Sequence, residues 1–179
     1  IHPDLFENIS QSGFENKLAV IKKQTRDSMN RIEFYSLISP LVTTIGDGHT
    51  SLFYPRNDLE AINARLFPYP VEIKWQDSTA SISEDRSIPK TGMPIGSRIL
   101  QINNIPITKL IGKMYSYISG EKEFYKATSL TYSFTPLLYS LFADSTFTIQ
   151  YEFEGRKDQM IVHGVACNQR YPAIPQQKS

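Results

Sequence analysis

Apolar residues recur at helical spacing in the first part of the chain. Ser12 and Glu15 have the spacing of a capping box, in which a hydroxyl and a carboxylate each accept a hydrogen bond at the start of a helix. The positions that follow place Phe14, Leu18 and Ile21 on one helical face. This pattern predicts a helix over about residues 12–26.

A second helical pattern begins at Asn30, a residue type that often caps helices. Pro40 lies within it and lacks a backbone N–H, so we expect a kink there. Gly46 suits the left-handed position just after a helix. The apolar face of this predicted helix comprises Phe34, Leu37, Ile38, Leu41, Val42 and Ile45.

After Gly46 the pattern changes from helical spacing to short alternating runs. Residues 50–54 are β-branched or aromatic and predict a strand, and 59–66 predict a helical turn. Pro68 and Pro70 then mark a domain boundary. Beyond it, tight turns at 76–78, 103–104 and 154–157 separate predicted strands at 71–75, 79–83, 98–102, 105–107, 146–153 and 159–165.

Two helices interrupt this series of strands. Thr108 has the residue type of a cap, and apolar positions after it predict a helix through Ile118. A longer helix is expected over 121–143, bent or broken at Pro136. The sequence therefore predicts an α+β fold, with a helical region at 1–66, a β-rich domain with inserted helices at 67–167 (the insertion at about 119–144) and a linker or tail at 168–179.

Composition narrows the function classes. The formal net charge is +1, from 19 basic and 18 acidic residues, and no basic stripe stands out, so we expect no nucleic-acid partner. Cys167 is the only cysteine, which excludes an internal disulfide and a cysteine-rich zinc site. No apolar run approaches the ~20 residues of a membrane span. No glycine-rich phosphate loop is present, and we expect no cofactor.

One short segment carries candidate chemistry. Gly46-Asp-Gly-His-Thr-Ser-Leu52 holds the three side-chain types of a serine-protease triad within five residues. Known triads are assembled from separated segments, and no Gly-x-Ser-x-Gly elbow is present. A metal site would need a third ligand beside Asp47 and His49, and His2 and His163 are distant in sequence.

A structural role is the third interpretation of this segment. Asp47 would hydrogen-bond the backbone of a turn, and Gly48 would allow a positive φ. His49 would then pack beneath the loop, and Thr50 would begin the next strand. On this interpretation the segment holds a corner of the fold and contains no catalytic residue.

Two stretches in this order resemble one protein family. The first runs from Glu33-Phe34 through Leu41-Val42 to Ile45-Gly-Asp-Gly-His-Thr-Ser-Leu52, and the second is Ile95-Gly-Ser-Arg-Ile-Leu-Gln-Ile-Asn-Asn-Ile-Pro-Ile107. Together they look like the front half of the tail-specific, or C-terminal processing, serine peptidases. The resemblance extends over about residues 1–165 and implies that residues 67–167 form a PDZ-like domain.

The resemblance also implies that catalysis and substrate handling belong to different domains. The family carries its catalytic serine and lysine in a further domain after the PDZ-like one, so the nucleophile would lie beyond Ser179. This chain would then scaffold, and its PDZ-like domain would recognise or gate the tails of protein substrates. A possible peptide groove would be lined by Thr108, Ile111 and Tyr115. An extracytoplasmic location, periplasmic or at the cell envelope, is likewise implied.

Two other functions stay open at this level. The first is a stand-alone protein- or peptide-binding module without peptidase activity. The second is a small hydrolase that uses Asp47, His49 and Ser51 directly. No loop with alternating glycine and apolar residues precedes Val71, which argues against capture of a C-terminal carboxylate by backbone N–H groups.

Overall fold

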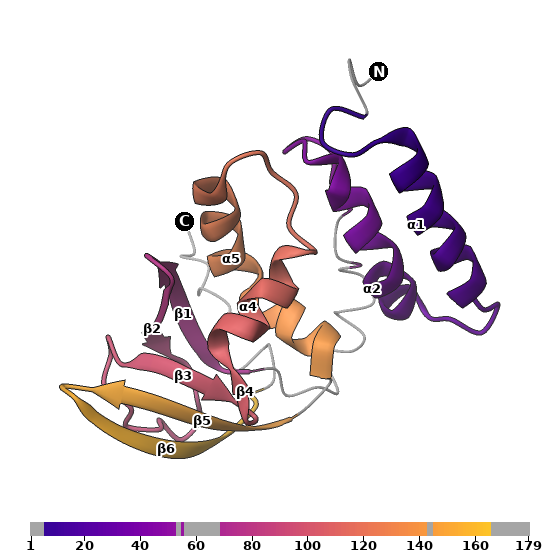
Figure 1. Cartoon of the computed structure of the whole chain (residues 1–179). Coiled ribbons are helices and arrows are strands. Elements are labelled where there is room, and N and C mark those ends of the chain that lie inside the picture. Colours follow the sequence, from indigo (N-terminus) through magenta and orange to yellow (C-terminus); the bar gives the residue numbers. More distant parts are fainter. Residues whose placement is uncertain (1–5, 53–54, 56–68, 143–144, 166–179) are drawn as a thin grey trace, which may run out of the picture.

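The computed structural model describes residues 6–52, 55, 69–142 and 145–165. The fold is α+β, as predicted, with a helical N-terminal region followed by a sheet that carries further helices (Figure 1). Its elements are α1 (Gln11–Gln24), α2 (Arg31–Val42), the 3-10 turn η1 (Thr43–Ile45), β1 (Val71–Gln76), β2 (Thr79–Asp85), β3 (Arg98–Ile102), β4 (Ile105–Pro106), α4 (Ile107–Tyr115), α5 (Glu123–Phe142), β5 (Thr146–Phe153) and β6 (Arg156–His163).

The first helix is present, but its predicted cap is wrong. Ser10, not Ser12, is the N-cap of α1, and its hydroxyl accepts a hydrogen bond of 3.1 Å from the Gly13 backbone N–H. Ser10 already has an extended backbone and its carbonyl accepts from the Phe14 N–H at 2.9 Å, so the helix begins two residues earlier than predicted.

The cap of the second helix is confirmed. The Asn30 side chain accepts from the N–H groups of Ile32 and Glu33, both at 2.9 Å, and Glu33 accepts from the Asn30 N–H at 3.0 Å. α2 contains Pro40 and tightens into η1 after Val42. Gly46 then ends the helical segment in the left-handed conformation, with φ of 79°, as predicted.

The strand predicted at 50–54 is wrong for residues 50–52. The Thr50 N–H donates to the Asp47 carbonyl at 3.1 Å, so the backbone turns back on itself here instead of extending into a ladder. Residues 53–54, the turn predicted at 59–66 and the predicted boundary before Tyr69 lie outside the described residues. The division into two domains at residue 66 therefore stays a prediction.

The predicted strands form one antiparallel sheet in the order β1-β2-β3-β5-β6, with β4 paired to β3. Its tight hairpins need left-handed backbone at both central residues, which Asn, Asp and Gly adopt most readily. The turn between β3 and β4 has φ of 50° at Asn103 and 61° at Asn104. The same sign of φ occurs at Asp77, Ser78, Glu154 and Gly155.

The helix after β4 begins and ends earlier than predicted. Pro106 is the N-cap of α4 without a side-chain cap, and Thr108 is an exposed residue of its first turn, so Thr108 does not cap it. Proline at this position removes no helical hydrogen bond, because the first N–H groups of a helix have no partner within the helix. The helix ends at Tyr115, not Ile118.

The hydrophobic core lies between the two layers of the β-rich part. α4 and α5 cover one face of the sheet, and the opposite face is lined by polar residues such as Ser81, Gln150 and Glu152 (Figure 1). On the covered face, Tyr69 packs edge-to-face against Phe134 of α5 and Phe147 of β5, with centroids 5.7 Å and 5.1 Å apart. This arrangement holds α5 across the sheet.

The N-terminal helices contact the rest of the chain through the segment that follows α4. Tyr35 of α2 stacks on Tyr117, with ring centroids 6.1 Å apart. The Thr43 hydroxyl donates to the Ser116 carbonyl at 2.6 Å, and the Tyr117 hydroxyl donates to the Ser36 carbonyl at 3.2 Å. The two parts are therefore joined by specific polar bonds as well as by an aromatic pair.

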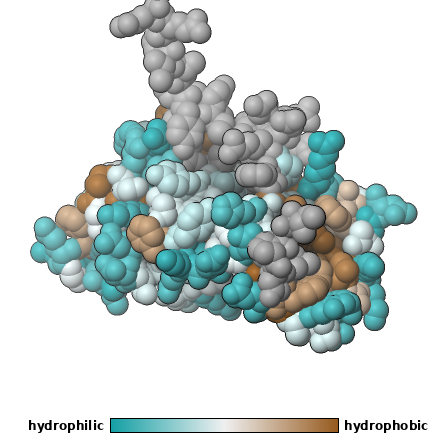
Figure 2. Space-filling model, turned by 90° about the horizontal axis from the view of Figure 1, so that it is seen from above, coloured by the Kyte–Doolittle hydropathy of each residue, from teal (hydrophilic) through white to brown (hydrophobic). Residues whose placement is uncertain are grey.

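The described surface is mostly hydrophilic when seen from above, and apolar side chains gather in separate groups toward its ends (Figure 2). None of the described helices has the length and apolar character needed to cross a bilayer.

Candidate functional site

Asp47 anchors the loop after η1 through several hydrogen bonds. Its Oδ1 accepts from the His49 backbone N–H at 3.1 Å and lies 3.3 Å from His49 Nδ1. Its Oδ2 accepts from the Thr50 hydroxyl at 2.9 Å. This is the hydrogen bonding expected of an aspartate that fixes a turn.

The imidazole of His49 projects into solvent, so the expectation that it packs beneath the loop is wrong. Its side chain is 100% exposed, whereas the Asp47 side chain is 18% exposed. Gly48 faces the ring of Tyr125, and a Cβ there would lie 4.0 Å from Tyr125 Cε1, so α5 occupies the inner side of the loop. A carboxylate at Nδ1 with Nε2 open to solvent is the arrangement of a histidine that accepts a proton from another group.

The local triad is not assembled. No hydrogen bond joins Ser51 to His49 in the described part of the chain, and Ser51 lines a neighbouring cleft instead. Among the described residues, no group of three or more His, Cys, Asp or Glu could hold a metal ion. His163 lies near Thr146, with Nδ1 3.3 Å from its hydroxyl, while His2 and Cys167 are outside the described ranges.

The loop is held from both sides by residues that sequence reasoning missed. The Ser119 hydroxyl donates to the Asp47 carbonyl at 2.6 Å, and the Asn8 side chain donates to the Ile45 carbonyl at 3.0 Å. Next to Ser119, Gly120 has φ of 148°, and a Cβ there would lie 2.6 Å from the Tyr125 ring. Glycine at 120 is the only local signal of this packing, and it does not indicate which loop is contacted.

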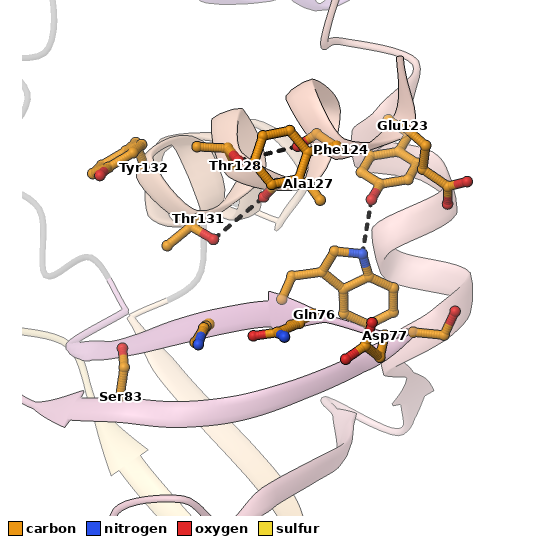
Figure 3. Close-up of a pocket in the computed structure, with 13 residues that line it drawn as sticks. Gln76, Asp77, Ser83, Glu123, Phe124, Ala127, Thr128, Thr131 and Tyr132 are labelled. Atoms are coloured by element: carbon orange, nitrogen blue, oxygen red, sulfur yellow. Dashed lines mark hydrogen bonds between the residues drawn. The ribbon is translucent and has the colours of Figure 1, made fainter.

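A cleft of about 820 Å³ lies between the edge strand β1 and the N-terminal half of α5. Figure 3 shows Gln76, Asp77 and Ser83 of the sheet on one side and the residues of α5 on the other. At one end the Trp75 indole N–H donates to the Tyr115 hydroxyl at 2.7 Å. Burial raises the Tyr115 pKa, the bond from Trp75 acts to lower it and the charge of Glu123 raises it further, so the phenol is neutral at pH 7.

The backbone of β1 presents hydrogen-bonding groups to this cleft at Trp75, whereas Ile73 is buried and does not line the cleft. Gln76 and Thr79 close the hairpin as a bonded pair, so the alternation of an antiparallel ladder turns the N–H and C=O of Trp75 and Ile73 away from β2. Ile82, opposite Ile73, bonds instead on its other side, to Gly96 and Ser97. No described strand pairs with the outer edge of β1.

The predicted groove residues do not lie together. Tyr115 lines the β1–α5 cleft. Thr108 lines a separate cavity of about 180 Å³ with residues of β2 and β3. Ile111 is 2% exposed and packs in the core. The helix beside β1 is α5, which the sequence places in the insertion, and not α4.

A second cleft, of about 320 Å³, lies on the other side of α5, against the Asp47 loop. Tyr35 and Tyr117 contribute to it, and burial raises the pKa of both phenols, so both stay protonated at neutral pH. Tyr132 lines both clefts.

Comparison with known proteins gives a likeness to a solved structure. No family model matches the chain, and no curated protein matches it by sequence. The crystal structure of a mutant of CPAF, a tail-specific-like serine protease, superposes with a TM-score of 0.55 at 10% sequence identity. The match covers 83% of this chain and 27% of that one, so this chain spans about a quarter of the length of the neighbour. At this identity the likeness establishes a shared fold.

Proposed function

We propose that this chain is the substrate-handling part of a serine peptidase of the tail-specific type, and that β1 receives an extended polypeptide segment as an added strand. The observation that carries the proposal is the edge of β1, which pairs with no described strand and lies beside a cleft bounded by α5. Backbone groups of β1 at Trp75 would supply hydrogen bonds, and the cleft would accept alternate side chains of the peptide.

Two observations support the peptidase context. The fold is shared with part of a tail-specific-like protease, and the order of the two sequence stretches is that of the family. On this proposal the catalytic serine belongs to a part of the protein beyond Ser179, and the location is extracytoplasmic. Reading the gene past Ser179 tests the context: a continuing frame for a serine-peptidase domain supports it, and a stop codon favours a stand-alone binding module.

Trp75 provides the test of peptide binding. It is the only tryptophan in the chain and lines the β1–α5 cleft, so its fluorescence reports on occupancy there. Titration with unstructured peptides should give a saturable change. The same peptides N-methylated at alternate residues should give none, because they cannot donate to the strand edge.

A matched variant locates the site. Ala127 lines the cleft from α5, so Ala127→Phe should obstruct it and remove the fluorescence response while the fold is retained. Gln159→Ala on β6, the opposite edge of the sheet, should leave the response unchanged. A response that survives both N-methylation and Ala127→Phe would exclude strand addition at β1.

A second candidate function rests on His49. Its solvent-facing imidazole, held by the Asp47 carboxylate, is suited to accept a proton from a nucleophile on another part of the protein. In the protein that carries such a nucleophile, His49→Ala should abolish labelling by a fluorophosphonate, and Ser51→Ala should leave it intact. Loss of label in Ser51→Ala as well as in His49→Ala would instead support the local hydrolase.

A further inference from the structure

The cleft between α5 and the Asp47 loop has a lining of unusual chemistry. Among the described residues its lining contains four tyrosines and four serines, together with glycine, proline and aliphatic residues, and none of these is charged. A ligand held here must therefore be neutral where it contacts the cleft, because no opposite charge would offset the desolvation of a buried ion.

Aromatic faces form the floor and the rim of this cleft. Tyr35 is 7% exposed and stacks on Tyr117 at an interplanar angle of 27°, which fixes both rings. Tyr125 and Tyr132 stand at the opening and are 50% and 83% exposed. Flat, fixed rings of this kind pack well against compact apolar rings of a ligand and lose little conformational entropy on binding.

The hydroxyl groups on the cleft side of α5 are not committed to the helix. Thr128 and Thr131, which line the other cleft, donate back to the carbonyls of Phe124 and Ala127 at 3.0 Å and 3.3 Å. Ser129 and Ser133 lie one turn apart and line the cleft between α5 and the Asp47 loop. Neither of their hydroxyl groups makes a hydrogen bond in the described part of the chain. They are donors available to a ligand.

Most carbonyls of α5 bond to the N–H groups of the helix itself, and Pro136, which has no N–H, leaves the carbonyl of Tyr132 without its usual helical donor. A β-strand placed against α5 would therefore find an acceptor for few of its N–H groups. A sugar would place donors and acceptors together, and no described residue of the lining brings a side-chain carboxylate, amide or guanidinium to meet them. The lining fits a ligand with flat rings, many carbonyl acceptors and few donors.

We propose that this cleft binds a proline-rich polypeptide segment in the polyproline II conformation. Such a segment has no internal hydrogen bonds, so its carbonyls are free to accept from the hydroxyls of Ser129, Ser133 and the rim residue Tyr125, and its prolines carry no N–H to satisfy. The tyrosine rings would contact the pyrrolidine rings. The proposal does not depend on peptidase activity or on strand addition at β1.

The test is fluorescence anisotropy of a labelled, terminally blocked decaproline titrated with the full chain. Saturable binding is expected, with no binding of a blocked Gly-Ser decapeptide. Ser129→Ala combined with Ser133→Ala should weaken binding roughly tenfold through the loss of two hydrogen bonds. The matched control is Thr128→Ala on the opposite side of α5, which should leave the affinity unchanged.

Three outcomes would overturn the proposal. They are equal binding of the two peptides, insensitivity to the double serine variant, or tighter binding of maltohexaose, a neutral oligosaccharide, than of decaproline. Circular dichroism and thermal unfolding show whether each variant is folded. If the double serine variant does not fold, Tyr125→Phe takes its place. This substitution removes only a hydroxyl at the rim of the cleft and should weaken binding about threefold. Competition against the Trp75 fluorescence response separates this cleft from the β1 edge.

Discussion

The hydroxyl of Ser119 donates a 2.6 Å hydrogen bond to the carbonyl of Asp47, across 72 residues of sequence. The bond joins the segment after α4 to the loop that carries His49, and so fixes where the imidazole stands relative to α5. Ser119 is 4% exposed, which makes this bond a buried tertiary contact and not a surface feature.

Removing that hydroxyl should loosen the loop. Ser119→Ala is expected to lower the free energy of unfolding by ~1 kcal/mol, measured by urea denaturation. The cost stays near this value because the Asp47 carbonyl still accepts from the Thr50 N–H. Ser116→Ala is the control, since the exposed Ser116 hydroxyl donates only to the nearby Lys113 carbonyl and should change stability by less than ~0.5 kcal/mol.

Substitutions at Asp47 and at His49 should differ in their effect on the free energy of unfolding. Asp47→Ala removes the acceptor for the His49 N–H and the Thr50 hydroxyl, and should lower the free energy of unfolding by ~1–2 kcal/mol. His49→Ala should change it by less than ~0.5 kcal/mol, because the side chain is fully exposed. A large loss of stability in His49→Ala would argue against a free imidazole.

Gly120 should tolerate no side chain. Its φ of 148° is strained for any L residue with a Cβ, and a Cβ would lie 2.6 Å from the ring of Tyr125. Gly120→Ala is expected to lower the thermal midpoint, with a loss of at least ~1 kcal/mol. Combining it with Tyr125→Ala removes the clash but not the backbone strain. The cost of the added methyl group should therefore be smaller in that background but not zero.

Acid should weaken the loop that follows β2. Asp85 accepts hydrogen bonds from the Ser87 N–H at 2.8 Å, from the Ser87 hydroxyl, and from the Thr91 N–H and hydroxyl at 2.8 Å and 2.7 Å. Burial acts to raise the Asp85 pKa, but the bonds from Ser87 and Thr91 together outweigh it and hold the pKa below its usual value. The stabilisation is complete above the unfolded pKa of about 3.9 and is lost as pH falls through the lower, folded pKa.

Asp85→Asn tests this linkage. Its amide nitrogen cannot accept from Thr91, so the variant should be less stable than the parent at pH 7 by ~2 kcal/mol, the scale of hydrogen bonds to a charged group. The difference should shrink as the pH falls below about 4, where the unfolded chain begins to bind the proton, and further as the pH falls through the lower pKa of the folded parent. Urea denaturation across pH 2.5–7 measures it, and a difference that is independent of pH would contradict a role for the charge.

Much of the fold follows from local sequence. Asn30 and Glu33 specify their own cap through side-chain bonds to the backbone, and the pair Asn103–Asn104 specifies a hairpin because asparagine tolerates left-handed backbone. The cap of α1 was misplaced because Ser10 and Ser12 are equally suited to the role, and only the backbone conformation distinguishes them. The strand predicted after His49 was wrong because a turn bond from Thr50 prevails over β-branched propensity.

The candidate site likewise has features that follow from local sequence and features that depend on tertiary packing. The sequence by itself determined an α+β chain with antiparallel hairpins and a polar loop after a helix, because capping, turn chemistry and period-two alternation act over a few residues. Only the tertiary structure decided that His49 stands in solvent, that α5 rather than α4 flanks the β1 edge, and that Ser119 holds Asp47. Those features depend on which distant surfaces pack together, and no local pattern of residues encodes the pairing of positions 72 residues apart.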